Sequence, residues 1–150
     1  AGDSVVGARQ IRDVLVDGSA AERFGKLIAE LGGPADFVDR WRDRLPAARV
    51  MREVLAGERG YVETIDGEAL GLAVVHLGGG RLRQGDRIDP TVGLTDVALI
   101  GDAVTPDSPL AVIHAASDEA ADKVHDTVLN AFALSPRKPK EPPLVHRSIR

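Results

Sequence analysis

The first third of the chain places apolar residues at helical spacing between polar ones. Asp3 suits the start of a helix, and Asp17-Gly18 interrupts the pattern that follows it. Ser19, with Glu22 three residues later, has the spacing of a capping box that opens a second helix. This second helix is predicted to carry one apolar face that needs a packing partner. The residues of that face are Ala20, Phe24, Leu27, Ile28 and Leu31.

Glycine and proline then mark the next boundary. Gly32-Gly33 suits the end of the second helix, and Pro34 suits the first turn of a short third helix. That third helix carries Phe37, Val38 and Trp41. Three short helices, each with one apolar face, should pack on something else. We therefore interpret residues 1–45 as a helical segment that belongs to another, truncated α/β domain.

From residue 46 onward, short β-favouring runs alternate with turns and two helical repeats. Asp66 and Ser117 each precede one of these repeats and suit its N-cap. Gly67 and Gly71 weaken the first repeat but permit close approach to a neighbouring backbone. The pattern predicts strands at residues 50–54, 60–65, 92–100 and 109–114, helices at 66–77 and 117–132, an extended linker at 135–143 and a closing edge strand at 144–149. The fold class predicted is α+β, with residues 46–150 as one module.

Composition narrows the function classes. The net charge is −4, and Lys and Arg are interspersed with Asp and Glu, which argues against a nucleic-acid partner. The chain has no cysteine, which excludes disulfide and thiolate chemistry and fits a reducing compartment. No apolar run approaches the ~18 residues that span a bilayer, and no signal-peptide pattern opens the chain. We expect a cytoplasmic protein without a membrane or nucleic-acid partner.

The run Gly78-Gly79-Gly80-Arg81 is the first candidate for chemistry, because glycine backbones approach phosphate closely and arginine pairs with it. Phosphate-binding loops normally precede a helix, whereas this run follows one. We interpret it as a helix stop and tight turn, with Arg81 and Arg83 exposed.

The remaining candidates are isolated polar side chains. The histidines lack the spacing of a helical zinc site, the serines lack a nucleophile elbow, and loop aspartates usually satisfy turn backbones. We assign no catalytic, phosphate-binding or metal-binding residue. The side chains considered are His76, His114, His125, His146, Ser108, Ser117, Ser135, Asp86, Asp89 and Asp96.

Several linked motifs nevertheless resemble one family, the thymidine and pyrimidine nucleoside phosphorylases. Their order and spacing match over nearly the whole chain, apart from the Pro/Lys-rich segment 135–143. The motifs are DGSAAERF (17–24), GPADFV (33–38), GYV (60–62), ID (65–66), ALGLAVV (69–75), LGGGR (77–81), DRID (86–89), VGLTD (92–96) and PLAVIH (109–114).

The resemblance implies an α/β-hammerhead domain, related to barrel-sandwich hybrids, over residues 46–150. It also implies a pentosyltransferase of nucleoside salvage that needs no organic cofactor and is homodimeric when intact. Its substrates are inorganic phosphate and a pyrimidine nucleoside, and thymidine yields thymine and 2-deoxy-D-ribose 1-phosphate. The family's catalytic groups are a Gly/Ser/Thr-rich phosphate loop with its lysine and an Arg, Ser, Lys and His set around the base. None of these motifs occurs here, so we expect a C-terminal fragment that is inactive without the N-terminal lobes.

Two alternatives remain open. One is a fragment of a broader phosphorylase that accepts both thymidine and uridine. The other is a non-catalytic barrel-sandwich binding or scaffold module. Residues 101–104 and 109–113 resemble half of a biotinyl or lipoyl motif, but a carrier needs a lysine at a hairpin tip. The four lysines, Lys26, Lys123, Lys138 and Lys140, all lie outside the β region, which argues against a carrier.

Overall fold

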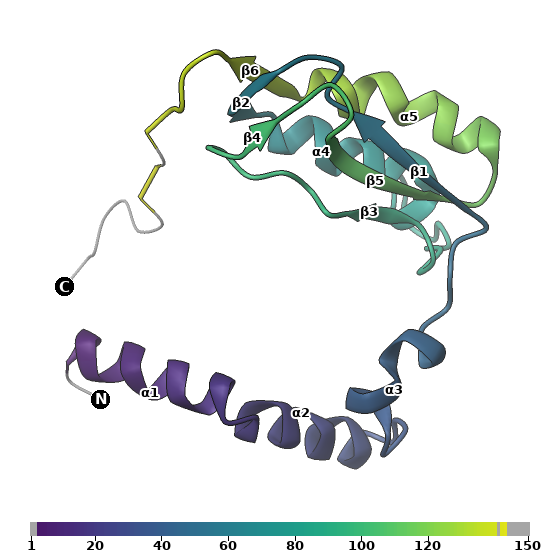
Figure 1. Ribbon diagram of the computed structural model, residues 1–150. Coiled ribbons are helices and arrows are strands. Elements are labelled where there is room, and N and C mark those ends of the chain that lie inside the picture. Colours follow the sequence, from purple (N-terminus) through teal and green to yellow (C-terminus); the bar gives the residue numbers. More distant parts are fainter. Residues whose placement is uncertain (1–2, 141, 144–150) are drawn as a thin grey trace. The chain divides into compact units, whose positions relative to one another are not determined.

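A computed structural model describes residues 3–140 and 142–143 of the chain. The chain divides into two compact units, Ala1–Pro46 and Ala47–Arg150 (Figure 1). Helices account for all regular structure described in the first unit, and the second unit mixes helices with strands. None of the described helices combines the length and apolar character that a membrane crossing requires.

The first unit consists of three helices, and their starts follow local hydrogen bonding. Asp3 caps the first helix, as predicted, by accepting the backbone N–H groups of Val5 and Val6. The third helix begins three residues after Pro34, which lies in the preceding turn. The helices are α1 (Ser4–Val16), α2 (Ser19–Glu30) and α3 (Phe37–Arg44).

The predicted capping box at the start of α2 is wrong. The N-cap is Gly18, in a left-handed conformation with φ 83°, and Ser19 is already the first helical residue. Asp17 Oδ1 accepts the Ser19 N–H at 2.8 Å, because a charged carboxylate two residues earlier is a strong local acceptor. Glu22 instead pairs with Lys26, one turn along the helix.

The predicted end of α2 at Gly32-Gly33 is confirmed. Gly33 donates its N–H to Ile28 O at 2.9 Å, and Gly32 donates to Ala29 O at 3.0 Å. These two bonds form a Schellman motif, which requires a left-handed residue just past the helix. Gly32 supplies it with φ 86°.

The second unit is α+β and contains two three-stranded antiparallel sheets. One sheet has the strand order β1-β5-β3, and the other has the order β4-β2-β6. The strands are β1 (Val50–Leu55), β2 (Gly60–Ile65), β3 (Gly93–Thr95), β4 (Ala103–Val104), β5 (Pro109–Ala115) and β6 (Phe132–Ser135). The helices are α4 (Gly67–Val74), the π-helical turn η1 (Val75–Gly79) and α5 (Asp118–Asn130).

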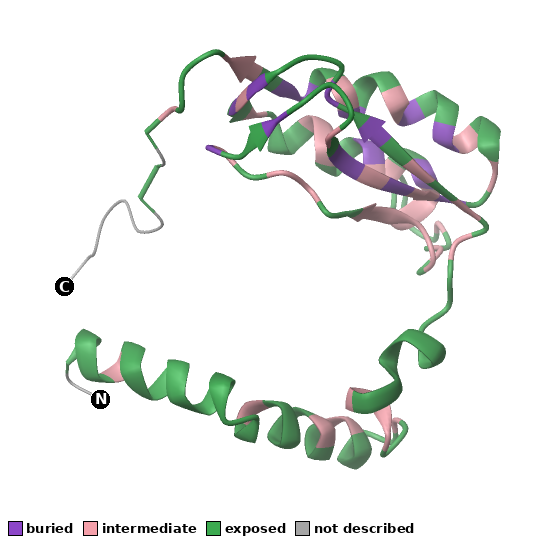
Figure 2. Cartoon of the chain, in the orientation of Figure 1, coloured by how far each residue is buried: buried purple, intermediate pink, exposed green. Residues whose placement is uncertain are grey.

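One hydrophobic core joins these sheets and helices. Its fully buried side chains come from β1, β2, β5, α4 and α5, so both sheets contribute to the same core (Figure 2). Burial of aliphatic side chains removes apolar surface from water and is the main stabilising contribution to this unit. The largest fully buried side chains are Val54, Val62, Leu110, Ile113 and Val128.

The strand predicted at residues 92–100 is wrong in length, and two short strands, β4 and β6, were not predicted. Only Gly93–Thr95 pairs with β5, after which Asp96 adopts a positive φ of 50°. The chain then crosses between the sheets: Ala98 donates to Leu110 O of β5, and Gly101 donates to Val62 O of β2. Residues 98–101 therefore connect the two sheets and cannot continue either one.

Both predicted caps in the second unit are confirmed. Asp66 accepts the Ala69 N–H at 2.9 Å, and Ser117 accepts the Ala120 N–H at 3.2 Å. The predicted close approach at Gly67 and Gly71 is wrong, because a Cβ at either position would meet no atom within 4 Å.

Towards the C-terminus, the predicted linker is confirmed in its described part. Residues 136–140 and 142–143 contain no helix or strand, although Ser135 itself closes β6. The edge strand predicted at 144–149 lies outside the described residues.

Candidate functional site

The triple glycine forms a packed turn at the end of η1. Gly78 has φ 101°, and its carbonyl accepts the Asp89 N–H at 2.9 Å. A Cβ on Gly79 would lie 2.8 Å from Val74 Cγ1, so this glycine is required by close packing. The turn thus binds its own loop and the preceding helix, as expected for a helix stop.

The arginine-bearing loop after this turn is organised by one carboxylate. Asp86 Oδ2 accepts the backbone N–H groups of Leu82 at 3.0 Å and Arg83 at 2.8 Å. Arg81 Nε donates to the backbone carbonyl of Asp86 at 3.3 Å. Two N–H groups that an anion would need are therefore already bound, while the side chains of Arg81 and Arg83 are exposed as predicted.

The other loop aspartates also bind their neighbours. Asp89 Oδ1 accepts from both the backbone N–H and the hydroxyl of Thr91, at 2.9 and 2.7 Å. These bonds lower the pKa of Asp89 below its ordinary value, and the bond from the Thr91 hydroxyl has a larger effect than the bond from the Thr91 N–H. Asp96 Oδ2 accepts from the Thr95 hydroxyl at 3.0 Å. Asp86 and Asp89 thus hold turns, whereas Asp96 binds the hydroxyl of the adjacent residue.

The three described histidines lie on three different elements. His114 is half-buried on β5, with Nε2 2.9 Å from the Thr95 hydroxyl, and His125 lies 3.2 Å from Asp126 on α5. His76 is exposed, and His146 lies outside the described residues. Within residues 3–140 and 142–143, no group of three His, Cys, Asp or Glu side chains is positioned to hold a metal ion.

The candidate serines also have local bonding partners. Ser117 caps α5, and the Ser108 hydroxyl accepts the Thr105 N–H at 2.9 Å. Ser135 donates its hydroxyl to Arg137 O at 2.6 Å. None of these hydroxyls is bonded to a histidine, so the described residues contain no serine–histidine pair.

The sequence did not single out Arg52, which forms the main ionic contact between a sheet and a helix in the second unit. Its guanidinium binds Asp118, at 2.7 Å, and Asp122, both on α5. The alternation of Val50, Arg52 and Val54 indicates that Arg52 lies on the same face as the two valines, because side chains two apart in a strand share one face. The presence of an arginine on the face covered by α5 implies acidic partners on that helix.

The most extensive candidate surface belongs to the helical unit. Among its described residues none is buried, and Figure 2 shows α1 almost entirely exposed and α2 a mixture of exposed and intermediate residues. Phe24, Leu27 and Trp41 are 47%, 54% and 42% exposed. Their exposure fits the apolar face predicted from spacing alone. Large exposed apolar surfaces mark sites of interaction with another protein surface.

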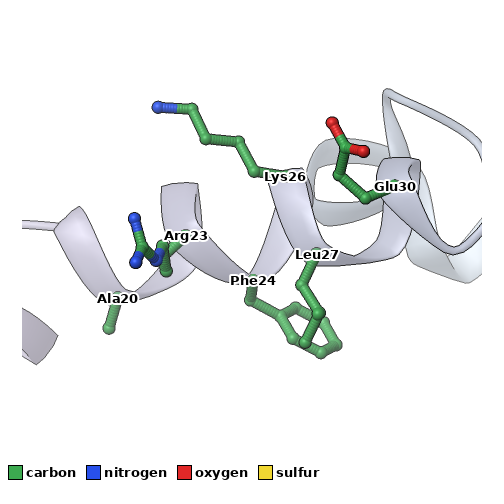
Figure 3. Close-up of a pocket in the computed structure, with 6 residues that line it drawn as sticks. All are labelled: Ala20, Arg23, Phe24, Lys26, Leu27 and Glu30. Carbon is green, nitrogen blue, oxygen red and sulfur yellow. The ribbon is translucent and has the colours of Figure 1, made fainter.

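This surface includes a groove along α2. Figure 3 shows Phe24 and Leu27 projecting from one side of the helix, with Ala20 one turn earlier. Arg23, Lys26 and Glu30 complete the lining. We call the residues Ala20, Phe24, Leu27 and Leu31 the α2 stripe.

A comparison with family models identifies the second unit. Residues 61–135, half of the chain, match the pyrimidine nucleoside phosphorylase C-terminal domain. The match runs from β2 to the last residue of β6 and so includes the triple glycine, the arginine-bearing loop and α5. The chain therefore belongs to the pyrimidine nucleoside phosphorylase family, of which it carries the C-terminal domain.

Proposed function

We propose that the chain is the C-terminal part of a cytoplasmic thymidine phosphorylase and is inactive on its own. In the whole enzyme, an oxygen of inorganic phosphate attacks the anomeric carbon of thymidine. The N-glycosidic bond breaks, its electrons leave with the pyrimidine, and the base takes up a proton. The products are thymine and 2-deoxy-D-ribose 1-phosphate.

A structural role is supported by the hydrogen bonds that the candidate polar side chains form with neighbouring residues. Asp86, Asp89 and Ser117 hold backbone N–H groups of their own turns. The Gly78 carbonyl binds the same loop. Phosphorolysis requires cationic groups for phosphate and donors for the departing base, positioned before the reaction. Groups that already hold turns are poor candidates for these tasks.

The helical unit supplies the second support. Its apolar side chains need a surface to cover them, and a segment of this size without a core does not hold a stable fold alone. We infer that the N-terminal lobes of the same enzyme cover the α2 stripe. The C-terminal domain then supports the lobe that binds phosphate, and its hammerhead topology remains a prediction.

The test is phosphate-dependent release of thymine from thymidine, followed by chromatography, with uridine in parallel. The chain alone should give no product, and the N-terminal part of a thymidine phosphorylase, expressed separately, should restore turnover. Turnover of uridine at a similar rate would favour the broader pyrimidine nucleoside phosphorylase. Sustained turnover by the chain alone would overturn the proposal.

A matched pair of variants links restoration to the helical surface. Phe24→Glu should prevent restored turnover, because it places a charge in the covered face. Leu82→Glu is the control, since Leu82 is 68% exposed on a loop of the other unit. Equal turnover with both variants would show that the α2 stripe does not receive the N-terminal lobes.

A further inference from the structure

We propose that the α2 stripe is also a self-complementary interface, through which two copies of this chain associate by an antiparallel α2–α2 pair. The inference goes beyond the proposed function, since it concerns the chain when no N-terminal lobe covers the stripe. It rests on the spacing of the stripe, on the face of α2 that α3 leaves open, and on two charges that flank it.

The spacing favours a helix as the occupant. Ala20, Phe24, Leu27 and Leu31 follow one another at intervals of four, three and four residues. This is the spacing of the apolar seam between two paired helices, in which each side chain inserts between those of the facing helix. Phe24, Leu27 and Leu31 are 47%, 54% and 76% exposed, so the seam is accessible.

The stripe is a second apolar face, separate from the one that α3 covers. On the α3 side, Gly25 lies close to Val38: a Cβ at Gly25 would be 3.1 Å from Val38 Cγ2. Ile28 contacts Gly33 in the turn between α2 and α3, where a Cβ on the glycine would be 2.6 Å from Ile28 Cγ2. Only Phe24 contributes to both faces, through an edge-on contact with Phe37 at a ring-centroid distance of 6.2 Å. A helix with two apolar faces is suited to lie between two neighbours, and α3 provides one of them.

The flanking charges select an antiparallel second copy. Arg23 and Glu30 lie seven residues apart on the flank of the stripe away from Ile28. Within the described part of the chain neither forms an ion pair, whereas Lys26 is held by Glu22 at 2.6 Å. Both side chains are exposed and available to a partner.

In an antiparallel pair, one register brings the apolar side chains into contact and also places opposite charges side by side. With Phe24 against Leu27 of the second copy, Ala20 faces Leu31 of the second copy. The same register brings Arg23 beside Glu30 of the second copy, and the two-fold axis repeats that pair. A parallel pair would place each residue opposite its own copy and would bring no opposite charges together.

The test is the mass of the chain in solution by sedimentation equilibrium over a concentration series. A single helix pair buries less than the roughly 1,200–2,000 Å² of stable specific complexes, so we expect a concentration-dependent monomer–dimer equilibrium. Phe24→Glu should give a monomer at every concentration, and Leu82→Glu should leave the dimer unchanged. Circular dichroism of each variant checks that the second unit remains folded.

Charge reversal tests the register. Arg23→Glu and Glu30→Arg should each weaken dimerisation several-fold, because each places two pairs of like charges together. The double variant should recover the wild-type dissociation constant, since it restores both opposite-charge pairs. A monomeric wild-type chain, a Phe24→Glu dimer or a double variant no better than the single ones would each overturn the proposal.

Adding the N-terminal part separates this inference from the proposed function. If the catalytic proposal and the α2–α2 interface are both correct, the N-terminal part displaces the second copy. Each chain then forms a complex with one N-terminal part, and turnover appears. Dimerisation without restored turnover would contradict the catalytic proposal alone. Restored turnover from a chain that is monomeric by itself would contradict the interface alone.

Discussion

Arg52 of β1 donates from Nη2 to Oδ1 of Asp118, 2.7 Å away on α5, across a separation of 66 residues in the chain. A second guanidinium nitrogen binds Asp122, one turn further along the helix. The Arg52 side chain is 30% exposed and those of the two aspartates are 72% and 69% exposed. The contact therefore joins the sheet and the helix at the surface of the second unit.

Replacing Arg52 with methionine should lower the melting temperature only slightly, because exposed ion pairs are screened by water. The difference from wild type should shrink further at high salt, which screens such pairs. Thermal unfolding at low and at molar NaCl measures both effects. A loss that stays the same in high salt would show that packing of the arginine stem dominates.

Replacing two different glycines with alanine should change the stability of the second unit in opposite directions. Gly79→Ala should destabilise the second unit by about 1–3 kcal/mol, because its Cβ would lie 2.8 Å from Val74 Cγ1. Gly71→Ala should stabilise it by about 0.5–1 kcal/mol, since its Cβ meets open space within α4. Urea unfolding of both variants gives the comparison. Destabilisation by both would mean that the space beside Gly71 is filled in solution.

Acid should weaken the loop that Asp89 holds. The hydrogen bonds from Thr91 lower the pKa of Asp89 from its ordinary value of 3.8. Because the pKa is lower in the folded state, the ionised Asp89 stabilises the fold above pH 3.8, the pKa in the unfolded chain. This stabilisation is lost as the pH falls through the pKa of the folded state. Asp89→Asn should therefore be less stable than wild type near neutral pH, with the difference narrowing in acid. Unfolding at a series of pH values measures it, with Asp107→Asn as a control on another exposed turn.

The second unit should fold without the first. All buried core residues described lie between Val54 and Phe132, and none lies in the helical unit. A protein of residues 47–150 should thus unfold at the same temperature as the whole chain, and the helical segment alone should lack stable helicity. Calorimetry and circular dichroism of the two pieces decide this. A markedly lower melting temperature for residues 47–150 would show that the helices stabilise the second unit.

What the sequence predicted well was local. The caps by Asp3, Asp66 and Ser117 involve partners two or three residues away, so a short pattern contains all the information needed. The same reasoning failed at Ser19, because Asp17 and Glu22 compete to accept its backbone N–H. The spacing pattern favoured the capping box, while Asp17 took the Ser19 N–H.

What the sequence did not predict depends on distant pairing. β4 and β6 are short, and they become strands because β2 lies between them. Likewise, residues 98–101 have the composition of a strand but are bonded to two different sheets. The alternation in β1 places Arg52 on the covered face, but its partners lie on α5, 66 and 70 residues along the chain, and the alternation does not identify them.

The family match begins at residue 61, after β1, although β1 forms one side of the sheet in which β5 is central. A protein trimmed to residues 61–135 would lose Val54 from the core and leave one side of β5 without its neighbour. The bared backbone N–H and C=O groups of β5 would then be a template for strands of other molecules, and such a trimmed protein would aggregate. The boundary at which this domain can be expressed is therefore set by β1, well before the first matched residue.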